Sequence, residues 1–167
     1  MMESDHCRAR FSISASDGLA RSGQLNLPRG SVATPAFMPV GTQASVKAVA
    51  PDDLLQLGAE IILANTYHLM LRPGPDLIES FGGVSTFMSW NRPVLTDSGG
   101  FQVYSLADRR ELSEEGVRFQ SHLDGSYHDL TPERAIGIQF QLGADVIMSL
   151  DVCASFDAPE EEQIEAM

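Results

Sequence analysis

The sequence predicts an α/β fold built from parallel β/α units. A near-repeat carries this prediction, because Leu57–Ile62 and Leu142–Ile147 share the pattern Leu-Gly-Ala-acid-β-branched-Ile. In both copies a helix is expected to end at the glycine, and a strand that is hydrophobic on both faces follows, which is typical of parallel sheets. Polar residues follow each strand, as at the ligand-binding edge of a (β/α)8 TIM barrel. Since a complete barrel takes about 250 residues, we expect the 167 residues to hold its amino-terminal part, with the carboxyl-terminal half absent.

Residues 1–42 are expected to form an antiparallel entry segment in front of the barrel. Phe11–Leu27 alternates around the turn dipeptide Asp17-Gly18, and Val32–Val40 is interrupted by prolines. Residues 43–167 then supply the first β/α units of a single barrel domain.

The first unit begins with a predicted helix over Pro51–Leu57, which Gly58 would end. A strand is expected over Ala59–Leu63, and polar residues follow it in Asn65-Thr66-Tyr67-His68.

The next strand runs into a polar, glycine-rich segment. Val94 and Leu95 have strand character, and Asp97-Ser98-Gly99-Gly100-Phe101 follows almost at once. Glycines let backbone N–H groups approach a flat ligand closely, and a phenylalanine ring offers a stacking face. The alternative is an ordinary turn in which Asp97 accepts local backbone hydrogen bonds.

A hairpin is predicted near residues 117–130, because strand-like runs flank the turn dipeptide Asp124-Gly125. We interpret His122 and His128 in this region as exposed strand residues.

A second helix–strand unit follows the hairpin. Thr131 is a candidate N-cap for a helix that continues to Leu142. A strand is expected over Ala144–Met148 and leads to Asp151, and residues 158–167 begin another helix with acids in its first turn.

The polar residues after these strands are expected to converge, because carboxyl ends of parallel strands meet at one edge of a sheet. The residues concerned are Asn65, His68, Asp97, Ser98 and Asp151.

Charge argues against an extended nucleic-acid-binding surface on this chain. The formal net charge is −12, Lys47 is the single lysine, and residues 111–167 carry thirteen acidic side chains against Arg118 and Arg134. Because phosphate binding depends on Lys and Arg, any contact with a polyanion is expected to be local or to use residues outside this sequence. The sequence shows neither an apolar run that could cross a membrane nor a secretory leader, so a cytoplasmic protein is expected.

Cys7 and Cys153 are expected to be reduced thiols. Neither has a neighbour at the spacing of zinc ligands, so no metal site is expected within this sequence.

Three motifs in order closely resemble the tRNA-guanine transglycosylase family, in its bacterial form. They are Asn65-Thr66-Tyr67-His68-Leu69 with Leu71-Arg72-Pro73-Gly74, then Thr96-Asp97-Ser98-Gly99-Gly100-Phe101-Gln102-Val103, then Ser121-His122-Leu123-Asp124-Gly125. The resemblance extends from about Phe11 to the last residue and covers the amino-terminal part of a full member. It implies a (β/α)8 barrel with a zinc-bearing subdomain near its carboxyl end, a homodimer, and tRNA as the substrate. The implied reaction replaces guanine at the anticodon wobble position with preQ1, a 7-deazaguanine, in queuosine biosynthesis.

The resemblance also implies roles for individual residues. Asp151 would accept hydrogen bonds from N1–H and the exocyclic amine of guanine, which an acceptor-only carboxylate can take together. Asp97 would be the catalytic general acid and base. Binding of the base would be completed by Asp97, Ser98, Gly99, Gly100 and Phe101, the last by stacking on the purine. The family's nucleophilic aspartate and its zinc ligands lie outside this sequence, so the segment alone is expected to be inactive and to hold no cofactor.

One residue departs from the family pattern, in which bacterial members usually carry Asp-Glu-Cys at Asp151-Val152-Cys153. In the family this glutamate helps the pocket to accept bases with different 7-substituents, so its absence affects the expected preference for preQ1. Cys153 matches the bacterial pattern, whose members take preQ1 rather than queuine. Two other classes stay open. One is a barrel glycosidase that uses Asp97 and Asp151 as paired carboxylates. Sugar-binding sites usually contain several aromatic side chains, and the single tryptophan of this sequence, Trp90, argues against this class. The other is a non-catalytic fragment that serves association.

Overall fold

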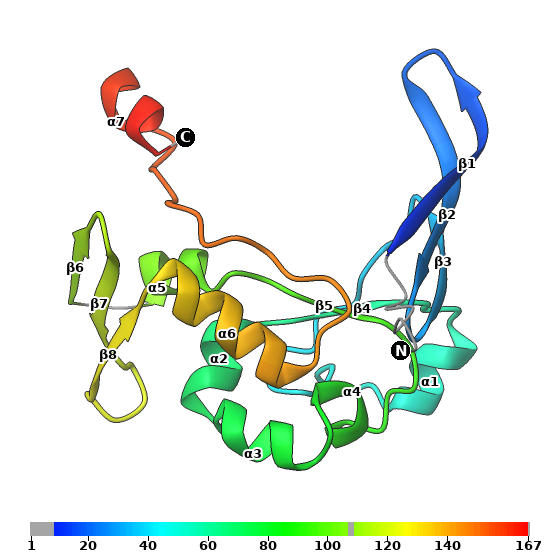
Figure 1. The fold of residues 1–167 in the computed structure, drawn as a ribbon, viewed down its shortest axis with the longest axis horizontal. Helices are drawn as coiled ribbons and strands as arrows, with labels where there is room; N and C mark the ends of the chain where they lie inside the picture. The colour runs from blue at the N-terminus through cyan, green and yellow to red at the C-terminus, as the bar shows by residue number, and fades with distance from the viewer. Residues whose placement is uncertain (1–8, 107–108, 167) are drawn as a thin grey trace, which may run out of the picture.

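A computed structural model describes residues 9–106 and 109–166 (Figure 1). These residues form a mixed α/β structure whose strands belong to three separate sheets. One antiparallel sheet projects at each end of a central body, and this body holds a short parallel sheet and most of the helices (Figure 1). The predicted α/β class is thus confirmed, while the described residues show no closed sheet.

The amino-terminal sheet is antiparallel, as predicted for the entry segment. Its strands, in order across the sheet, are β1 (Arg10–Asp17), β2 (Ala20–Leu27) and β3 (Gly30–Thr34). Gly18 occupies the turn between the first two strands with a φ of 58°, a left-handed conformation that glycine adopts without steric cost. Leu27 and Val32 are buried against Ile61, so this sheet packs on the start of the parallel sheet.

The parallel sheet brings four chain segments side by side. Its assigned strands are β4 (Ile62–Ala64) and β5 (Val94–Thr96), which pair in parallel. Val40 forms a parallel bridge to Leu63 on one side, and Val146 forms one to Leu95 on the other. The carboxyl ends of these segments therefore lie along one edge.

Both predicted strands of the near-repeat are shorter in the structure. Instead of Ala59–Leu63, β4 covers Ile62–Ala64, because the N–H of Ala59 still bonds to the carbonyl of Leu54 and closes the preceding helix. The strand expected over Ala144–Met148 is reduced to the bridge at Val146.

The side chain of Gln139 explains the second difference. Its Oε1 accepts the N–H of Met148 at 2.9 Å, and its Nε2 donates to the carbonyl of Met148 at 2.8 Å. Met148 thus satisfies its backbone groups on an amide side chain instead of on a neighbouring strand.

Two predicted helices are present with the expected caps. The first is α1 (Pro51–Gln56) and the second is α6 (Pro132–Leu142). Thr131 Oγ1 accepts the N–H of Arg134 at 3.2 Å, and Gly143 ends α6 in the left-handed region at a φ of 67°. The helix expected within residues 158–167 is α7 (Glu160–Glu165).

Four short helices were not predicted. They are α2 (Thr66–Leu71), α3 (Pro75–Ser80), α4 (Val84–Phe87) and α5 (Gly100–Leu106). Asn65-Thr66-Tyr67-His68, interpreted as a strand end, is in fact the N-cap and first turn of α2.

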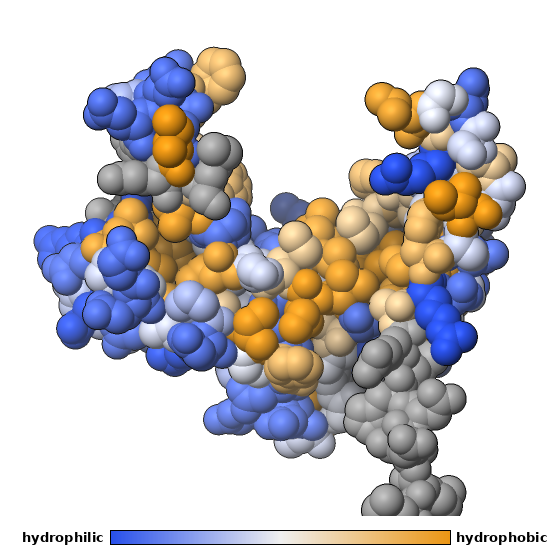
Figure 2. Space-filling view, turned by 45° about the horizontal axis from the view of Figure 1, so that its top comes forward, coloured by the Kyte–Doolittle hydropathy of each residue, from blue (hydrophilic) through white to orange (hydrophobic). Residues whose placement is uncertain are grey.

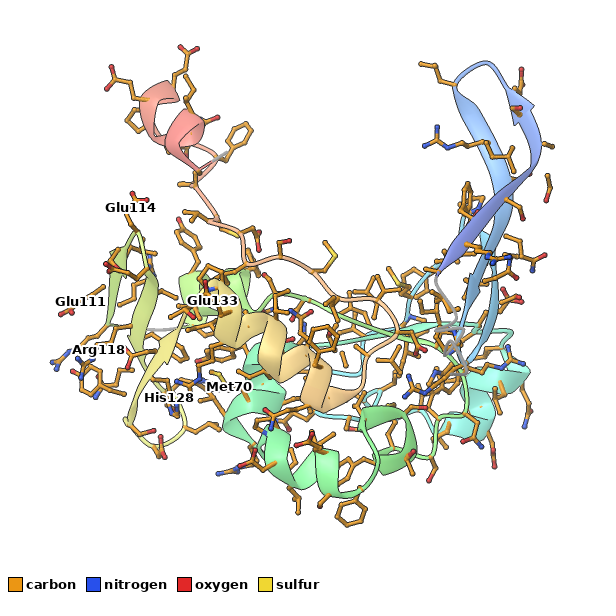
Figure 3. The ribbon with its side chains drawn as sticks, viewed as in Figure 1. Met70, Glu111, Glu114, Arg118, His128 and Glu133 are labelled. Carbon is orange, nitrogen blue, oxygen red and sulfur yellow. The ribbon has the colours of Figure 1, made fainter. Side chains whose placement is uncertain are left out.

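The second antiparallel sheet contains the predicted hairpin. Its strands are β6 (Arg110–Ser113), β7 (Gly116–Gln120) and β8 (Tyr127–Leu130), in that order. The first of them was not predicted. Glu111 and Arg118 are paired across adjacent strands of this sheet (Figure 3). His122 lies in the turn after β7 and not in a strand, which corrects the interpretation made from the sequence.

One main core joins the central body to this second sheet. Tyr67, Trp90 and Phe119 are its largest fully buried side chains. At the opposite end Arg29 Nη1 contacts Asp145 Oδ2 at 2.8 Å, which connects the first sheet to the segment beside β5. Figure 2 shows hydrophobic side chains across the hollow between the two projecting sheets. Among the described residues, no helix has the length and apolar character needed to cross a membrane.

Candidate active site

Asp97 is held at the carboxyl end of β5 by three donors. Its Oδ1 accepts the backbone N–H of Thr66 at 2.8 Å. Its Oδ2 accepts Nδ2 of Asn65 at 2.5 Å and Nε2 of Gln102 at 3.0 Å. Because α2 begins directly after β4, its first N–H and its N-cap side chain both point at the end of the neighbouring strand. The half-buried carboxylate is therefore fixed in orientation by two helices.

Asp151 faces the same loop from the next segment of the parallel sheet. The Ser98 hydroxyl donates to Asp151 Oδ1 at 2.5 Å and accepts the N–H of Gly100 at 3.1 Å. Ser98 is buried while Asp151 remains exposed. Ser98 thus connects the loop that carries Asp97 to the carboxylate of Asp151.

Gly99 and Gly100 lie so close to neighbouring backbone atoms that a side chain at either position would not fit without a shift. A Cβ on Gly100 would lie 2.6 Å from the carbonyl oxygen of Asp151, which real Cβ atoms do not tolerate. Gly99 has a φ of 86°, and a Cβ there would lie 3.3 Å from the backbone nitrogen of Tyr67. The glycines therefore let the loop contact α2 on one side and the Asp151 segment on the other.

Phe101 and Cys153 complete the group of predicted residues in this region. Phe101 lies on the first turn of α5 and is 59% exposed, so its ring is open to a ligand. The Cys153 thiol donates to Asp151 Oδ2 at 3.5 Å. Burial raises the pKa of Cys153, and the negative charge of Asp151 adds to this shift. The thiol consequently stays protonated beside the carboxylate.

A small cavity of about 70 Å³ opens beside Asp151. Its walls come from α5, from β6 and β7, and from the segment after Met148. The residues nearest the candidate site are Gly100, Tyr104, Arg110, Leu150, Asp151 and Cys153. Arg110 lies over the ring of Tyr104, 4.6 Å from its centroid, and this wall of the cavity is thereby ordered.

The expected convergence of strand ends is confirmed as a matter of geometry. Asn65 bonds to Asp97, and Ser98, the next residue in the chain, bonds to Asp151. The negative charge of Asp97 acts on His68. Burial lowers the pKa of His68, repulsion from His122 lowers it further, and Asp97 opposes both. Asp97 is not confined to a local turn, since two of its three side-chain donors come from residues 31 and 32 positions away.

Sequence reasoning missed two residues of this region. Gln102 was named as part of a motif and given no role, yet it lies in the first turn of α5, where its long side chain reaches back to Asp97. His122 was assigned to an exposed strand, but its ring contacts Tyr67, a long-range pairing for which the sequence carries no local signal.

Metal ligation has no candidate in the part of the chain that the structure describes, where no three His, Cys, Asp or Glu side chains form a suitable group. These residues thus do not fit a zinc site. Cys7 lies outside the described residues.

Comparison with known proteins places the chain in a family. A profile described as queuine tRNA-ribosyltransferase matches residues 16–167. Proteins named queuine tRNA-ribosyltransferase are 54% identical in Cereibacter sphaeroides over 160 residues and 56% identical in Zymomonas mobilis over 156 residues. A third, from Moorella thermoacetica, is 59% identical over 143 residues.

The matches cover most of this chain but less than half of each relative. The matches include 96%, 93% and 86% of this chain but 43%, 40% and 38% of those relatives. The chain therefore spans about two fifths of the length of the relatives it matches. Because the family profile covers most of the sequence, the chain belongs to the queuine tRNA-ribosyltransferase, or tRNA-guanine transglycosylase, family.

Proposed function

We propose that this chain supplies the base-binding and acid–base residues of a tRNA-guanine transglycosylase. The enzyme would exchange guanine at the anticodon wobble position for preQ1 in queuosine biosynthesis. The observation that supports this best is the connection of Asp97 to Asp151 through Ser98, at one edge of the parallel sheet. Family membership favours this reaction over the glycosidase alternative.

Recognition of the base is proposed for Asp151. Guanine presents N1–H and an exocyclic amine as adjacent donors, and a carboxylate has about four acceptor positions on its two oxygens. Ser98 and Cys153 use one position on each oxygen, so both oxygens retain capacity for a ligand. Phe101, exposed on α5, would stack on the purine and replace stacking lost when the nucleotide leaves the anticodon loop. Backbone groups of Ser98, Gly99 and Gly100 would line the pocket.

Proton transfer is proposed for Asp97. The departing guanine must gain a proton on a ring nitrogen as its bond to C1′ of the ribose breaks, and the incoming base must lose one. A single carboxyl group can do both in turn if it stays within hydrogen-bond reach of the base: as the acid it gives its proton to the departing guanine, and as the carboxylate it takes one from the incoming base. Three donors fix the orientation of Asp97, which favours this role. The nucleophile that holds the ribose between the two steps belongs, by resemblance, to a later strand outside this sequence.

The remaining parts of the proposal follow from family membership. We propose that residues 1–42 are an entry segment and residues 43–167 the first units of a (β/α)8 barrel, with a zinc subdomain elsewhere in the complete protein. The complete protein would act on tRNA in the cytoplasm as a homodimer. Val152, which is 54% exposed beside Asp151, replaces the acidic residue that the family pattern leads one to expect. PreQ1 remains the proposed incoming base.

A chimera tests the proposal. This chain replaces the matching 156 residues of the Zymomonas mobilis relative, and exchange of labelled guanine into tRNA is measured. We expect the chimera to exchange guanine, and we expect added preQ1 to compete with guanine in this reaction. A chimera that folds with the melting profile of the parent but exchanges no guanine would overturn the proposal.

A further inference from the structure

Tyr67 has a buried hydroxyl whose hydrogen bond crosses between two elements. The side chain is fully buried in α2, and its hydroxyl lies 2.8 Å from Nδ1 of His122 in the turn after β7. Burial raises the pKa of the Tyr67 phenol, against a smaller lowering from a hydrogen bond of the His122 backbone. The phenol therefore remains protonated, and the tautomer of His122 determines whether the hydroxyl donates to Nδ1 or accepts from it.

Ring contacts reinforce this hydrogen bond. The Tyr67 and His122 rings are stacked at 5.5 Å between centroids with an interplanar angle of 17°. Phe119 lies 5.4 Å from Tyr67, and His68 meets Tyr67 edge-on at 5.3 Å. The β6–β8 sheet is thus attached to α2 through a cluster of four rings, Tyr67, His68, Phe119 and His122.

The turn that presents His122 is itself well braced. The N–H of Ser121 donates to the carbonyl of Ser126 at 2.7 Å, and the Ser126 hydroxyl donates to Asp124 Oδ1 at 2.7 Å. A braced turn holds Nδ1 of His122 in one place, so the bond to Tyr67 constrains α2 and not only the turn.

Tyr67 is directly adjacent to the groups that hold Asp97. The residue before it, Thr66, donates its N–H to Asp97 Oδ1, and Asn65 donates to Oδ2. Gly99 also lies so close to Tyr67 that a Cβ on Gly99 would be 3.3 Å from the backbone nitrogen of Tyr67. A displacement of Tyr67 would therefore reach both the donors of Asp97 and the loop that carries it.

From these contacts we infer that His122 is a positioning residue for base exchange. It fixes Tyr67, and through Tyr67 it sets the first turn of α2 and the orientation of the Asp97 carboxylate. This inference rests on the proposed function, since it assigns Asp97 to proton transfer. In this scheme His122 acts through its contact with Tyr67 and not by touching the base or the ribose.

The test uses the chimera described above with four variants. His122→Phe and Tyr67→Phe each remove one partner of the hydrogen bond and keep a ring. His122→Asn keeps a hydrogen-bonding group, because its amide can present either Oδ1 or Nδ2 at the position of Nδ1. The double variant combines the two Phe substitutions. His128→Phe is the matched control, since His128 lies on β8 of the same sheet and stacks on Phe119 without bonding to Tyr67 (Figure 3).

The expected pattern separates positioning from general damage. Each single Phe variant lowers kcat by about tenfold or more through misplacement of Asp97, while KM for tRNA changes less than about twofold. The double variant is no worse than either single one, because both remove the same hydrogen bond. His122→Asn recovers most of the lost kcat, and His128→Phe keeps the parent value.

Three results would overturn the inference. One is an equal loss in His122→Phe and His128→Phe, which would mean that the sheet as a whole is damaged. Another is a raised KM with unchanged kcat, which would make His122 a tRNA contact. The third is a crystal structure of the His122→Phe chimera in which the distances from Asp97 to Thr66 and Asn65 are unchanged. The crystallographic comparison needs no activity, so it decides the inference even if the parent chimera exchanges no guanine and the proposed function fails.

Discussion

The Ser98 hydroxyl donates to Oδ1 of Asp151 at 2.5 Å, so one buried side chain connects the ends of two neighbouring segments of the sheet. This bond constrains the orientation of the Asp151 carboxylate. It also makes the two sides of the candidate pocket depend on each other.

Substitution Asp151→Asn is expected to weaken guanine and preQ1 binding together. The amide has one acceptor oxygen and places donors against the donors of Ser98 or of the base, and such mispairing costs about 1–3 kcal/mol. Calorimetric titration of both bases into the chimera measures it. Unchanged affinities would place the base elsewhere.

Substitution Asp97→Asn is expected nearly to abolish base exchange while tRNA binding stays close to the parent value. An amide cannot take the proton, and its NH2 group would face donors from Thr66, Asn65 or Gln102. Labelled-guanine exchange and a tRNA gel-shift assay are compared in the same preparation. Near-normal turnover would remove Asp97 from the catalytic role.

Loss of the Phe101 ring is expected to cost about 1–3 kcal/mol of base affinity, the usual effect of one stacked aromatic. Phe140→Ala is the matched control, because Phe140 is also exposed, at 69%, and lies on α6. Affinity for guanine is measured in both variants and in Phe101→Tyr, which should retain binding. A Phe101→Ala protein that binds as tightly as the control would exclude stacking at this position.

The turn that carries His122 is expected to weaken only in strong acid. Hydrogen bonds from Ser126 lower the pKa of Asp124 to about 2, from 3.8. Because the folded-state pKa is the lower one, the stabilisation is complete above pH 3.8 and is lost as the pH falls from there to about 2. The free energy of unfolding is measured across this range for the parent and for Asp124→Asn, whose curve should lack this contribution. Parallel curves would contradict the assignment.

Residues 1–167 alone are expected to exchange no guanine and to bind tRNA weakly. They span about two fifths of the relatives' length, and in the described residues Val40 and Val146 form the two edges of the parallel sheet. Unpaired edges favour self-association, so melting should be poorly cooperative. The exchange assay and a melting curve test this. Robust turnover would show that the nucleophile lies within this sequence.

The sequence predicts elements well where the signal is local. Thr131 and Gly143 mark the ends of α6 because caps are chosen by neighbouring backbone groups, and the Asp124-Gly125 turn marks its hairpin for the same reason. Prediction from the sequence fails where a tertiary contact determines the local structure. Met148 has a strand-like sequence but pairs with Gln139, and α2 follows β4 without a spacer, so its residues look like the end of a strand.

The same distinction between local signals and tertiary contacts applies to the residues of the candidate site. Asp97, Ser98 and Asp151 could be found because they follow hydrophobic runs, and their roles remain proposals. His122 could not, because its contact with Tyr67 spans 55 positions of the chain.

The side chain of Gln139 behaves as a substitute peptide group. It offers Met148 one donor and one acceptor, just as a residue of an adjacent strand would, and it also accepts from Thr96 Oγ1 at 2.9 Å. The stretch leading to Asp151 is thus aligned by a helix behind the sheet. A leucine of similar size at this position would release that stretch, and guanine affinity would fall through a residue that never meets the base.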